Sequence, residues 1–401
     1  MRTTSSTLTR NLLALCVLAA TSLSAHAAVL SEWPLPAGSQ PLQIDASSPS
    51  RRIYFVDQAL STINQLDGGA SVLTSWPAPF TPSVPGSIVV DRFAATRFVY
   101  VTDLPATVLG QLDIITNIYF QYDLTLLPWN ISGGPRQLVY DNSYSVEPND
   151  EVVWFSASGD PASGSAPLIG YLAPATFKFR VWQLPASIAS PGEAIDGLAF
   201  VVTPSGPTVF FTVNGPGGNN NVDMLLPLAN SVTSWPLPPA YTQPVPIVAT
   251  RAGEVFRVQC AGCNTMARIS TTASLLDEWT SPVDATDMFL TLDAAVLAPR
   301  FTGLFAGMAT ADLLVTTCPF NTTRLVPHVE DAPNDAFYLE PYRIPVQPII
   351  EDAAPQVRNL DSTTMCPFIK WLPISSGGPI SMDNVGGTWI SETASPFIAN
   401  F

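Results

Sequence analysis

The chain has 401 residues and a formal net charge of −15, and 12% of its residues are charged against 47% that are hydrophobic. This composition excludes an intrinsically disordered chain, and the negative charge argues against nucleic acid as a partner because it repels phosphate backbones. The 39 prolines favour many short strands and turns over long helices.

Residues 1–27 have the pattern of a secretory signal peptide. Arg2 and Arg10 give a positive start, NLLALCVLAA is the apolar core, and AHA at 25–27 is a cleavage site of the A-x-A type. No later stretch is both long and uncharged enough to span a bilayer. We therefore expect a secreted protein, periplasmic in a Gram-negative source, in which residues 28–401 form a single domain with a net charge of about −17.

Tryptophans recur along residues 28–401 at intervals of 43–53 residues, and five of the six are followed by proline within three residues. They are Trp33, Trp76, Trp129, Trp182, Trp235 and Trp279. A second series consists of short aromatic strands at regular offsets from the tryptophans, namely RIYFVD (52–57), RFVYVTD (97–103), EVVWFSA (151–157), TVFFTV (208–213), EVFRVQC (254–260) and DLLVTT (312–317), with QVRNLD (356–361) and GTWISE (387–392) as weaker members.

Two further strands complete each unit. A third strand follows the aromatic strand, as in STINQL and NTTRLV, and a first strand precedes it, as in PLQID and PIIED. Such a repeat predicts an all-β fold, a β-propeller of four-stranded blades that pack radially around an axis. A set of β-sandwich domains is the alternative, with longer periods of about 90–100 residues. There are eight aromatic-strand candidates, but the last two, which begin at 356 and 387, lie closer together than the others, and the fourth strand FYLEPYRIPV lacks the tryptophan. The repeat therefore favours seven blades, with eight as the alternative.

The two ends of the predicted domain complement each other. SEWPLP (31–36) has the pattern of a fourth strand with no unit ahead of it, and SPFIANF (395–401) is a third strand with no fourth strand after it. We expect the N-terminal strand to complete the last blade and close the ring. The prolines after each tryptophan suit an outer strand with one unpaired edge, where a missing N–H costs little.

These units resemble the repeats of the streptogramin B lyase-like (virginiamycin B lyase-like) propellers. The matching residues are TMARI (265–269), GTWISE (387–392) and SEWPLP (31–36). The resemblance implies seven blades, a bound Mg²⁺, and histidine and glutamate side chains on one face that open a cyclic depsipeptide by elimination. The chain has two histidines, and His26 lies in the predicted signal peptide, so the family's catalytic histidines are apparently absent.

Acidic residues end several aromatic strands, and repeat symmetry places them on one face near the mouth of the central channel. They are Asp57, Asp103, Asp361 and Glu392. Together they could hold Ca²⁺ or Mg²⁺, which prefer oxygen ligands, and the alternative is that acids suit strand-ending turns. A second row follows the first strands, where we expect the carboxylates to bond their own backbone: Asp45, Asp91, Asp141 and Asp383.

His328 is the one histidine after the signal peptide, and we expect LVPHVED to be a loop. The neighbouring Glu330 and Asp331 could raise the pKa of His328 and make it a general acid or base. An ordinary surface histidine is the alternative.

Four cysteines follow the signal peptide: Cys260, Cys263, Cys318 and Cys366. An even number in an exported protein indicates disulfides, and we expect these thiols in the turns after aromatic strands. The preferred pairing is Cys318–Cys366 across neighbouring blades with Cys260–Cys263 as a local bridge, and a zinc site and a redox-active C-x-x-C are the alternatives. Asn130 and Asn321 lie in N-glycosylation sequons, which matter only in a eukaryotic source.

Two hypotheses of function follow. The first is a secreted binding or structural module whose acidic channel face holds a small molecule, a glycan or a protein, with or without a metal. The second is a metal-assisted lyase or hydrolase with a changed active site built on acids and His328. The scarcity of histidine favours the first, although the fold alone supports many functions.

Ring closure by the N-terminal strand is directly testable. Deleting residues 28–36 should destabilise the whole protein and not only its end, because the last blade would lose a strand. Thermal melting compares the truncated and full proteins, and an unchanged melting temperature would contradict the expectation.

Overall fold

In the computed structural model, the fold is described for the following residues: 28–46, 52–79, 85–92, 96–103, 107–129, 131, 134–148, 150–214, 221–236, 247–249, 254–258, 265–270, 275–280, 284–292, 299–306, 311–316, 321–324, 328–331, 335–338, 341–352, 356–360, 363–366, 369–374, 380–382, 388–392 and 397–400. Side chains are described mainly between 33 and 249, and beyond that at 341, 343–351 and 398.

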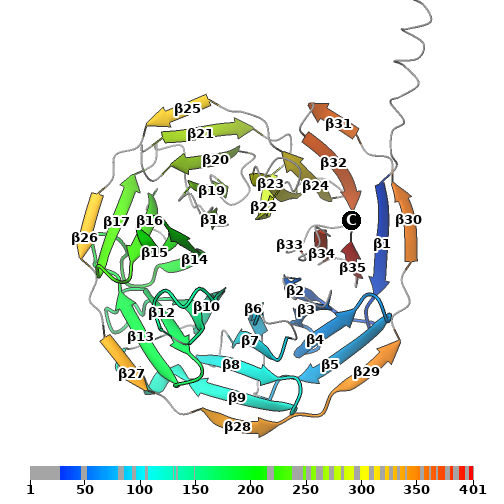
Figure 1. Cartoon of the computed structure of the whole chain (residues 1–401), viewed down its shortest axis with the longest axis horizontal. Coiled ribbons are helices and arrows are strands. Elements are labelled where there is room, and N and C mark those ends of the chain that lie inside the picture. Colours follow the sequence, from blue (N-terminus) through cyan, green and yellow to red (C-terminus); the bar gives the residue numbers. More distant parts are fainter. Residues whose placement is uncertain are drawn as a thin grey trace, which may run out of the picture.

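The strands of these described residues form seven sheets of five strands, arranged as a ring (Figure 1). The predicted all-β propeller is therefore confirmed. Its alternative, a set of separate sandwich domains, is wrong, since each sheet packs beside the next around one centre. Within the described part of the chain, no helix has the length and hydrophobicity needed to cross a lipid bilayer.

The first three sheets each contain four consecutive strands, ordered from the centre of the ring outward, and one distant strand at the outer edge. Sheet 1 contains β2 (Pro41–Asp45), β3 (Arg52–Asp57), β4 (Thr62–Asp67), β5 (Val72–Pro77) and β29 (Ile349–Asp352). Sheet 2 contains β6 (Pro85–Val90), β7 (Phe98–Asp103), β8 (Val108–Asp113), β9 (Ile118–Asp123) and β28 (Tyr342–Pro345), and the 3-10 helix η1 (Leu124–Leu126) follows β9. Sheet 3 contains β10 (Pro135–Asp141), β11 (Val152–Ala157), β12 (Leu168–Ala173), β13 (Lys178–Gln183) and β27 (Asp335–Tyr338).

The remaining sheets follow the same plan, with a different connection in the last two. Sheet 4 contains β14 (Ala194–Thr203), β15 (Gly206–Asn214), β16 (Asn221–Leu226), β17 (Ser231–Pro236) and β26 (His328–Asp331). Sheet 5 contains β18 (Ile247–Ala249), β19 (Glu254–Val258), β20 (Thr265–Ser270), β21 (Leu275–Thr280) and β25 (Asn321–Arg324). Sheet 6 contains β22 (Asp284–Leu292), β23 (Pro299–Ala306), β24 (Ala311–Thr316), β32 (Ile369–Ile374) and β31 (Thr363–Cys366). Sheet 7 contains β33 (Ile380–Met382), β34 (Thr388–Glu392), β35 (Phe397–Asn400), β1 (Ala28–Pro34) and β30 (Gln356–Leu360).

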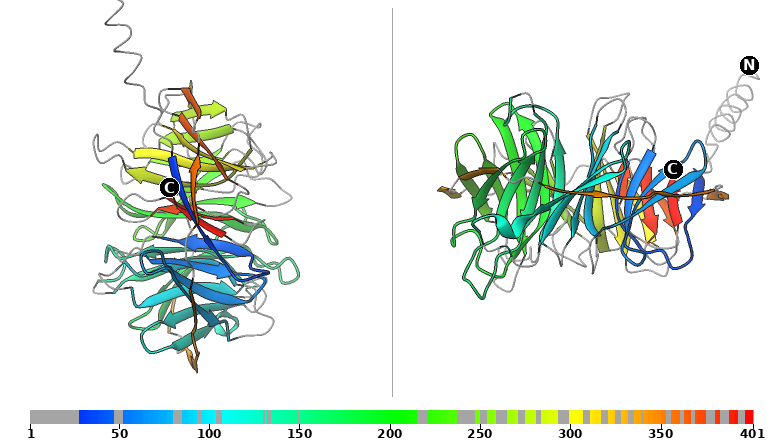
Figure 2. Two further views of the ribbon diagram at one scale, coloured as in Figure 1. Left: turned by 90° about the vertical axis from the view of Figure 1, so that its right-hand side faces the viewer. Right: turned by 90° about the horizontal axis from the view of Figure 1, so that it is seen from below.

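Neighbouring strands within a sheet are antiparallel, so the turns alternate between the two flat sides of the ring. We call face A the side that carries the turns between first and second strands and between third and fourth strands. Face B carries the turns between second and third strands. The right-hand view of Figure 2 shows the ring from its edge, with one face above and the other below.

The N-terminal strand closes the ring as predicted. β1 pairs with β35, so that Trp33 lies opposite Ile398. Both side chains are buried in one apolar cluster with Ile44 and Ile53 of sheet 1. The pairing joins the beginning and the end of the described chain within sheet 7.

A fifth strand on every sheet was not expected from the sequence. Residues 321–366 supply β25 to β31, which we call the belt, and each belt strand is the outermost strand of its sheet (Figure 1). Side views show the belt running around the perimeter at mid-height (Figure 2). The predicted four-stranded units are still present, because each sheet has four strands inside its belt strand.

The belt corrects the roles predicted for several segments. NTTRLV, PIIED and QVRNLD contain belt strands β25, β29 and β30, and FYLEPYRIPV contains the end of β27 and the whole of β28. DLLVTT lies in β24, which is the third strand of sheet 6, and β23 is the second. Their short, apolar, β-branched composition suits an outer strand as well as an inner one, so sequence alone did not separate the two roles.

The fourth strands are paired on both sides, so the predicted unpaired outer edge is wrong. β29 pairs with β5 as far as Ser75, and β26 pairs with β17 as far as Ser234. Pro77 and Pro236 lie beyond these paired residues. Proline therefore ends the pairing with the belt and does not interrupt it.

The fourth-strand tryptophans hold neighbouring sheets together. Trp76 Nε1 donates to Asn117 Oδ1 of sheet 2 at 3.0 Å, and Trp182 Nε1 donates to Asn230 Oδ1 of sheet 4 at 2.9 Å. Both asparagines precede a fourth strand and adopt left-handed backbone angles (φ 54° and 52°), which asparagine tolerates better than most residues. Trp129 breaks the predicted series, because it follows η1 and Tyr122 occupies the fourth-strand position of sheet 2.

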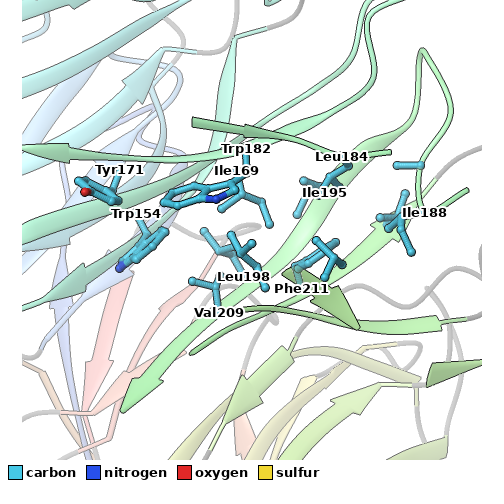
Figure 3. Close-up of a cluster of buried hydrophobic side chains, with 14 of the residues drawn as sticks. Trp154, Ile169, Tyr171, Trp182, Leu184, Ile188, Ile195, Leu198, Val209 and Phe211 are labelled. Atoms are coloured by element: carbon cyan, nitrogen blue, oxygen red, sulfur yellow. The ribbon is translucent and has the colours of Figure 1, made fainter. Parts of the chain in front are cut away.

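The core lies between the sheets and is apolar. Between sheets 3 and 4, Trp154 and Trp182 stack with ring centroids 5.8 Å apart, and Phe211 and Ile195 pack beside them (Figure 3). Burial of such side chains contributes about 2–3 kcal/mol each before the entropic cost of folding. Each sheet is thus stabilised mainly by its neighbours in the ring.

Glycine is required where a third strand meets a large ring. A Cβ on Gly110 would lie 1.6 Å from the Tyr119 hydroxyl, and a Cβ on Gly170 would lie 2.6 Å from Phe155 Cζ. Both glycines stand in the middle of third strands, β8 and β12. They leave room for an aromatic ring of the adjacent strand.

Gly110→Ala should reduce the free energy of unfolding by about 1–3 kcal/mol, because the added methyl group displaces the ring of Tyr119. Gly69→Ala is the matched control, since the nearest atom to its Cβ would be Asp67 Oδ1 at 3.5 Å. Denaturant unfolding of both variants measures the difference. Equal stabilities for the two variants would contradict this packing.

Candidate functional site

Side chains with displaced pKa values gather where sheets 2 and 3 meet on face A. The carboxyl groups belong to Asp91 at the end of β6, Asp141 at the end of β10, and Asp150 and Glu151 just before β11. Two buried phenols, Tyr100 and Tyr140, lie beside them. We call these six residues the sheet 2–3 cluster. Displaced pKa values concentrate at functional sites, so this cluster is the candidate site.

Asp91 closes the connection between β6 and β7. It is fully buried, and its carboxylate accepts hydrogen bonds from the N–H of Arg97 at 3.0 and 3.1 Å and from the N–H of Phe98 at 2.9 Å. Burial raises the pKa of Asp91 from 3.8 to about 6, because the hydrogen bonds offset only part of the lost hydration, and the charge of Glu151 adds to the rise. Asp91 therefore exchanges a proton near neutral pH.

The two phenols bridge the sheets beneath the carboxyl groups. Tyr100 on β7 and Tyr140 on β10 stack with ring centroids 6.3 Å apart. Gln111 donates to the Tyr100 hydroxyl at 3.4 Å and accepts from the Tyr122 hydroxyl at 2.9 Å. Burial raises the pKa of Tyr100 and Tyr140 well above 10.0, and nearby acidic groups add to the rise. Both phenols therefore stay neutral and add no charge to the cluster.

The connection from β10 to β11 presents an exposed tyrosine beside the cluster. Tyr144 is 45% exposed and has a left-handed backbone (φ 54°), which is strained for a bulky residue. Asp141 Oδ1 holds the start of the connection by accepting from Ser143 N at 2.7 Å. Backbone strain of this kind is common at ligand sites, where the surrounding contacts enforce it.

The middle of the same connection is fixed to sheet 3. Glu147 Oε1 accepts from the Tyr171 hydroxyl and from Lys178 Nζ, the latter at 2.6 Å. Thr176 Oγ1 donates to Asp150 Oδ2 at 3.3 Å, and Val146 is buried in the apolar cluster between sheets 3 and 4. Tyr144 is therefore held in place by an anchored connection.

The charges of the cluster are only partly compensated. Arg92 lowers the pKa of Asp141, although burial outweighs it, and Arg97 is paired with Asp113 at 2.7 Å. Burial likewise raises the pKa of Asp150 and of Glu151. Asp91 changes its protonation state near pH 6, and the four carboxyl groups together favour a positive charge placed close to them.

The acids predicted to surround the channel mouth do not form the cluster. Asp57 and Asp103 end β3 and β7 on face B, the opposite side of the ring. Asp57 Oδ1 accepts from Gln40 N and Leu60 N, each at 3.0 Å, as expected of an acid in a strand-ending turn. Glu392 ends β34, the second strand of sheet 7, and Asp361 lies outside the described residues. Asp361 follows belt strand β30, so its predicted place after a second strand is wrong.

Of the four acids in the predicted Ca²⁺ or Mg²⁺ site, the structure describes the side chains of Asp57 and Asp103 only. Among the residues that the structure describes, no group of three or more His, Cys, Asp and Glu side chains is arranged to hold a metal ion. The carboxylate of Asp57 already serves two backbone N–H groups. Metal binding therefore stays a prediction from the sequence.

His328 begins β26 and is not in a loop, contrary to the expectation. It lies opposite Ser234 in the outermost strand of sheet 4, on the perimeter of the ring. The sheet 2–3 cluster lies on other sheets, at the ends of innermost strands. The structure thus places His328 apart from the sheet 2–3 cluster, whereas Glu330 and Asp331 lie in the same strand β26.

The described members of the second acidic row accept hydrogen bonds from backbone N–H groups, but only Asp141 does so two residues on, as expected. Asp141 bonds two residues on, Asp91 bonds across its connection, and Asp45 Oδ2 accepts from Val90 N of the next sheet at 2.9 Å. Asp383 lies outside the described residues. The sequence signal that was missed is the length and acidity of NSYSVEPNDE (142–151), the connection that carries Tyr144 and Glu151.

The cysteines and sequons are only partly placed. Cys260, Cys263, Cys318 and Asn130 lie outside the described residues. Cys366 ends β31, and Asn321 begins β25 opposite Glu278. The premise that Cys318 and Cys366 follow aromatic strands of neighbouring blades is wrong, because β24 and β31 belong to the same sheet. The disulfide pairing itself stays a prediction.

Comparison with known proteins relates the fold to lyases. No protein-family model matches the chain, and no curated protein matches it. Selenomethionine-substituted virginiamycin B lyase from Staphylococcus aureus has a similar structure, with a TM-score of 0.61, 15% identity, and coverage of 93% of this chain and 99% of the lyase. A catalytically inactive histidine-to-alanine variant of that enzyme with quinupristin has a TM-score of 0.62 and 15% identity, and covers 93% of this chain and 99% of the lyase. A streptogramin B lyase has a TM-score of 0.59 and 16% identity, and covers 92% of this chain and 96% of the lyase. At this identity the likeness shows a shared propeller fold.

The displaced pKa values predict an unusual dependence of stability on pH. Asp91 has a pKa of about 6 in the folded protein, above the 3.8 of an unperturbed carboxyl, so the folded state binds a proton more tightly than the unfolded state. This contribution to folding stability is fully present below pH 4 and is lost as the pH rises through 6. Burial acts in the same direction on Asp141, Asp150 and Glu151. The free energy of unfolding should therefore increase as pH falls from 7.5 to 5, by about 1.4 kcal/mol from Asp91, because pH 5 lies one unit below its folded-state pKa of about 6 and each unit contributes roughly 1.4 kcal/mol.

The Asp91→Asn variant should flatten this pH dependence, measured by denaturant unfolding at each pH. Glu351→Gln is the control, because Glu351 is exposed on β29 and its replacement removes the same formal charge. Equal slopes for the two variants would contradict the assignment to Asp91.

Proposed function

We propose that the chain is an exported β-propeller that binds a cationic ligand, one bearing amino or guanidinium groups, through the sheet 2–3 cluster and Tyr144. The observation that carries the proposal is the grouping of four carboxyl groups with raised pKa values around one anchored connection. The signal-peptide pattern of residues 1–27 and the net charge of −15 support export and an affinity for cations.

The physical reason is the state of the carboxyl groups before binding. Asp91, Asp141, Asp150 and Glu151 are held where hydration is reduced, so their negative charge is poorly stabilised at neutral pH. A ligand cation placed beside them replaces the missing solvation and lowers their pKa values. Binding should therefore release protons and weaken as pH falls toward 5.

Tyr144 supplies the second element of recognition. Its ring is exposed beside the carboxyl groups and is held by an anchored backbone, so little conformational freedom remains to be lost on binding. A cation over a tyrosine face gains about 0.5–1 kcal/mol at an exposed site. Glycans and uncharged small molecules, which were also considered from the sequence, have no positive group that could pair with the carboxylates of the cluster.

The proposal is tested with a short lysine- and arginine-rich peptide and with spermidine, by calorimetric titration at pH 7.5 and pH 5. We expect binding that is stronger at pH 7.5 and that weakens with salt. Tyr144→Ala should reduce affinity about two- to fivefold, and Glu151→Gln should reduce it together with its pH dependence. Leu228→Ala, an exposed apolar residue between β16 and β17, is the control. Affinity unaffected by Tyr144→Ala and Glu151→Gln would refute this site.

A lyase of the streptogramin type is the second candidate, and the lyase structures with TM-scores near 0.6 favour it. One of these structures is of the lyase with quinupristin, which makes quinupristin the compound to test. Incubation with quinupristin and Mg²⁺, followed by mass analysis, detects ring opening. We expect none, because the one histidine after the signal-peptide pattern lies on the perimeter of the ring. Ring opening that is lost in His328→Ala would overturn that expectation.

Metal binding is tested separately, by measuring the melting temperature with added calcium or magnesium. Calcium or magnesium could bind the carboxyl groups as a simple cation, without the channel-mouth acids proposed from the sequence. A rise in melting temperature with either ion that Glu151→Gln abolishes would place the ion at the cluster. A rise that Glu151→Gln leaves intact would point to another set of acids.

A further inference from the structure

The belt has a constant step of seven residues. Its strands begin at residues 321, 328, 335, 342, 349, 356 and 363. They lie on sheets 5, 4, 3, 2, 1, 7 and 6 in that order, so the belt makes one turn around the ring against the order of the sheets (Figure 1). After β31 the chain supplies β32 of the same sheet and then β33, β34 and β35 of sheet 7.

The registers of the belt strands agree from sheet to sheet. β26 pairs with Ser231–Ser234, β27 with Lys178–Val181, β28 with Ile118–Gln121 and β29 with Val72–Ser75. In each case these are the first four residues of a fourth strand. Seven extended residues span at most about 25 Å, so one step reaches from one sheet edge to the next with little slack.

Val346 shows what a belt residue does between two sheets. It is 6% exposed and packs with Trp76 and Tyr119 in the cluster between sheets 1 and 2. Its N–H donates to Asn117 O at 2.8 Å, and Asn117 Oδ1 accepts from Trp76 Nε1 at 3.0 Å. The belt therefore covers the joint that the fourth-strand tryptophan makes with the next sheet.

The sequence repeats this apolar position in six of the seven steps of the belt. The equivalents of Val346 are Leu325, Ala332, Leu339, Ala353 and Leu360. Proline stands two residues later in four of the steps, at 327, 341, 348 and 355, where it limits the length of each exposed edge. An apolar residue thus recurs once per step, and each belt strand lies on a different sheet.

We propose that residues 321–366 form a circumferential clasp, in which each step adds one edge strand and one apolar residue that seals the joint between adjacent sheets. The clasp also holds β1, which lies between β35 and β30. The N-terminal strand cannot leave sheet 7 without breaking the pairing of β30. The clasp makes the sheets open together and not one at a time.

The experiment cuts the clasp in the folded protein. A protease recognition site inserted between Gln347 and Pro348 is cleaved after purification, and the two pieces stay together because each contributes strands to the ring. Cleavage should lower the melting temperature by about 5 °C or more and speed hydrogen exchange in fourth strands on both sides of the cut. The control carries the same site between Gly68 and Gly69, in the turn between β4 and β5 on face A.

Equal melting temperatures and exchange rates before and after cleavage at 347 would overturn the clasp. If the insertion prevents folding, Val346→Ala and Ile350→Ala decide the matter. Val346 is buried in a joint, whereas Ile350 is 68% exposed on the neighbouring belt strand. We expect Val346→Ala to lower the melting temperature and to speed exchange in β5 and β9, and Ile350→Ala to do neither. Indistinguishable variants would overturn the proposal.

Discussion

Backbone hydrogen bonding along the outer edge of each sheet is the constraint on which the ring depends. A four-stranded unit would leave its fourth strand with a row of unpaired N–H and C=O groups, and a ring of such units has as many exposed edges as sheets. In this protein residues 321–366 pair with every one of those edges. The edge that remains outermost consists of strands of four or five residues, which offer little for another chain to pair with.

The inner part of the ring could be predicted from the sequence. Trp33, Trp76, Trp182 and Trp235 mark fourth strands because one large ring is needed at each joint, and the orphan strand at 28–34 lies in the last sheet as its position implied. Sheet 2 departs from this pattern because Tyr122 fills the joint in place of tryptophan. Trp129 is the residue that the tryptophan spacing predicts as the marker of this fourth strand, but Trp129 lies after β9.

The belt could not be predicted by the same reasoning, since it obeys a different period. A repeat of 43–53 residues is seen by comparing tryptophans, whereas the belt repeats every seven residues and consists of strands too short to show alternation. PIIED and QVRNLD resemble inner strands because both kinds of strand need β-branched residues. The candidate site was missed for a related reason. Asp57 and Asp103 are related by the repeat, while Tyr144 and Glu151 lie in a connection that the repeat does not share.

The place of β1 has a consequence for the order in which the protein is made. β1 is among the first described residues to be synthesised, yet its two partners, β35 and β30, lie more than 300 residues later in the chain. At about 5–20 residues per second, a ribosome needs tens of seconds to reach them. The first strand must therefore wait, unpaired within its sheet, until almost the whole chain has been synthesised.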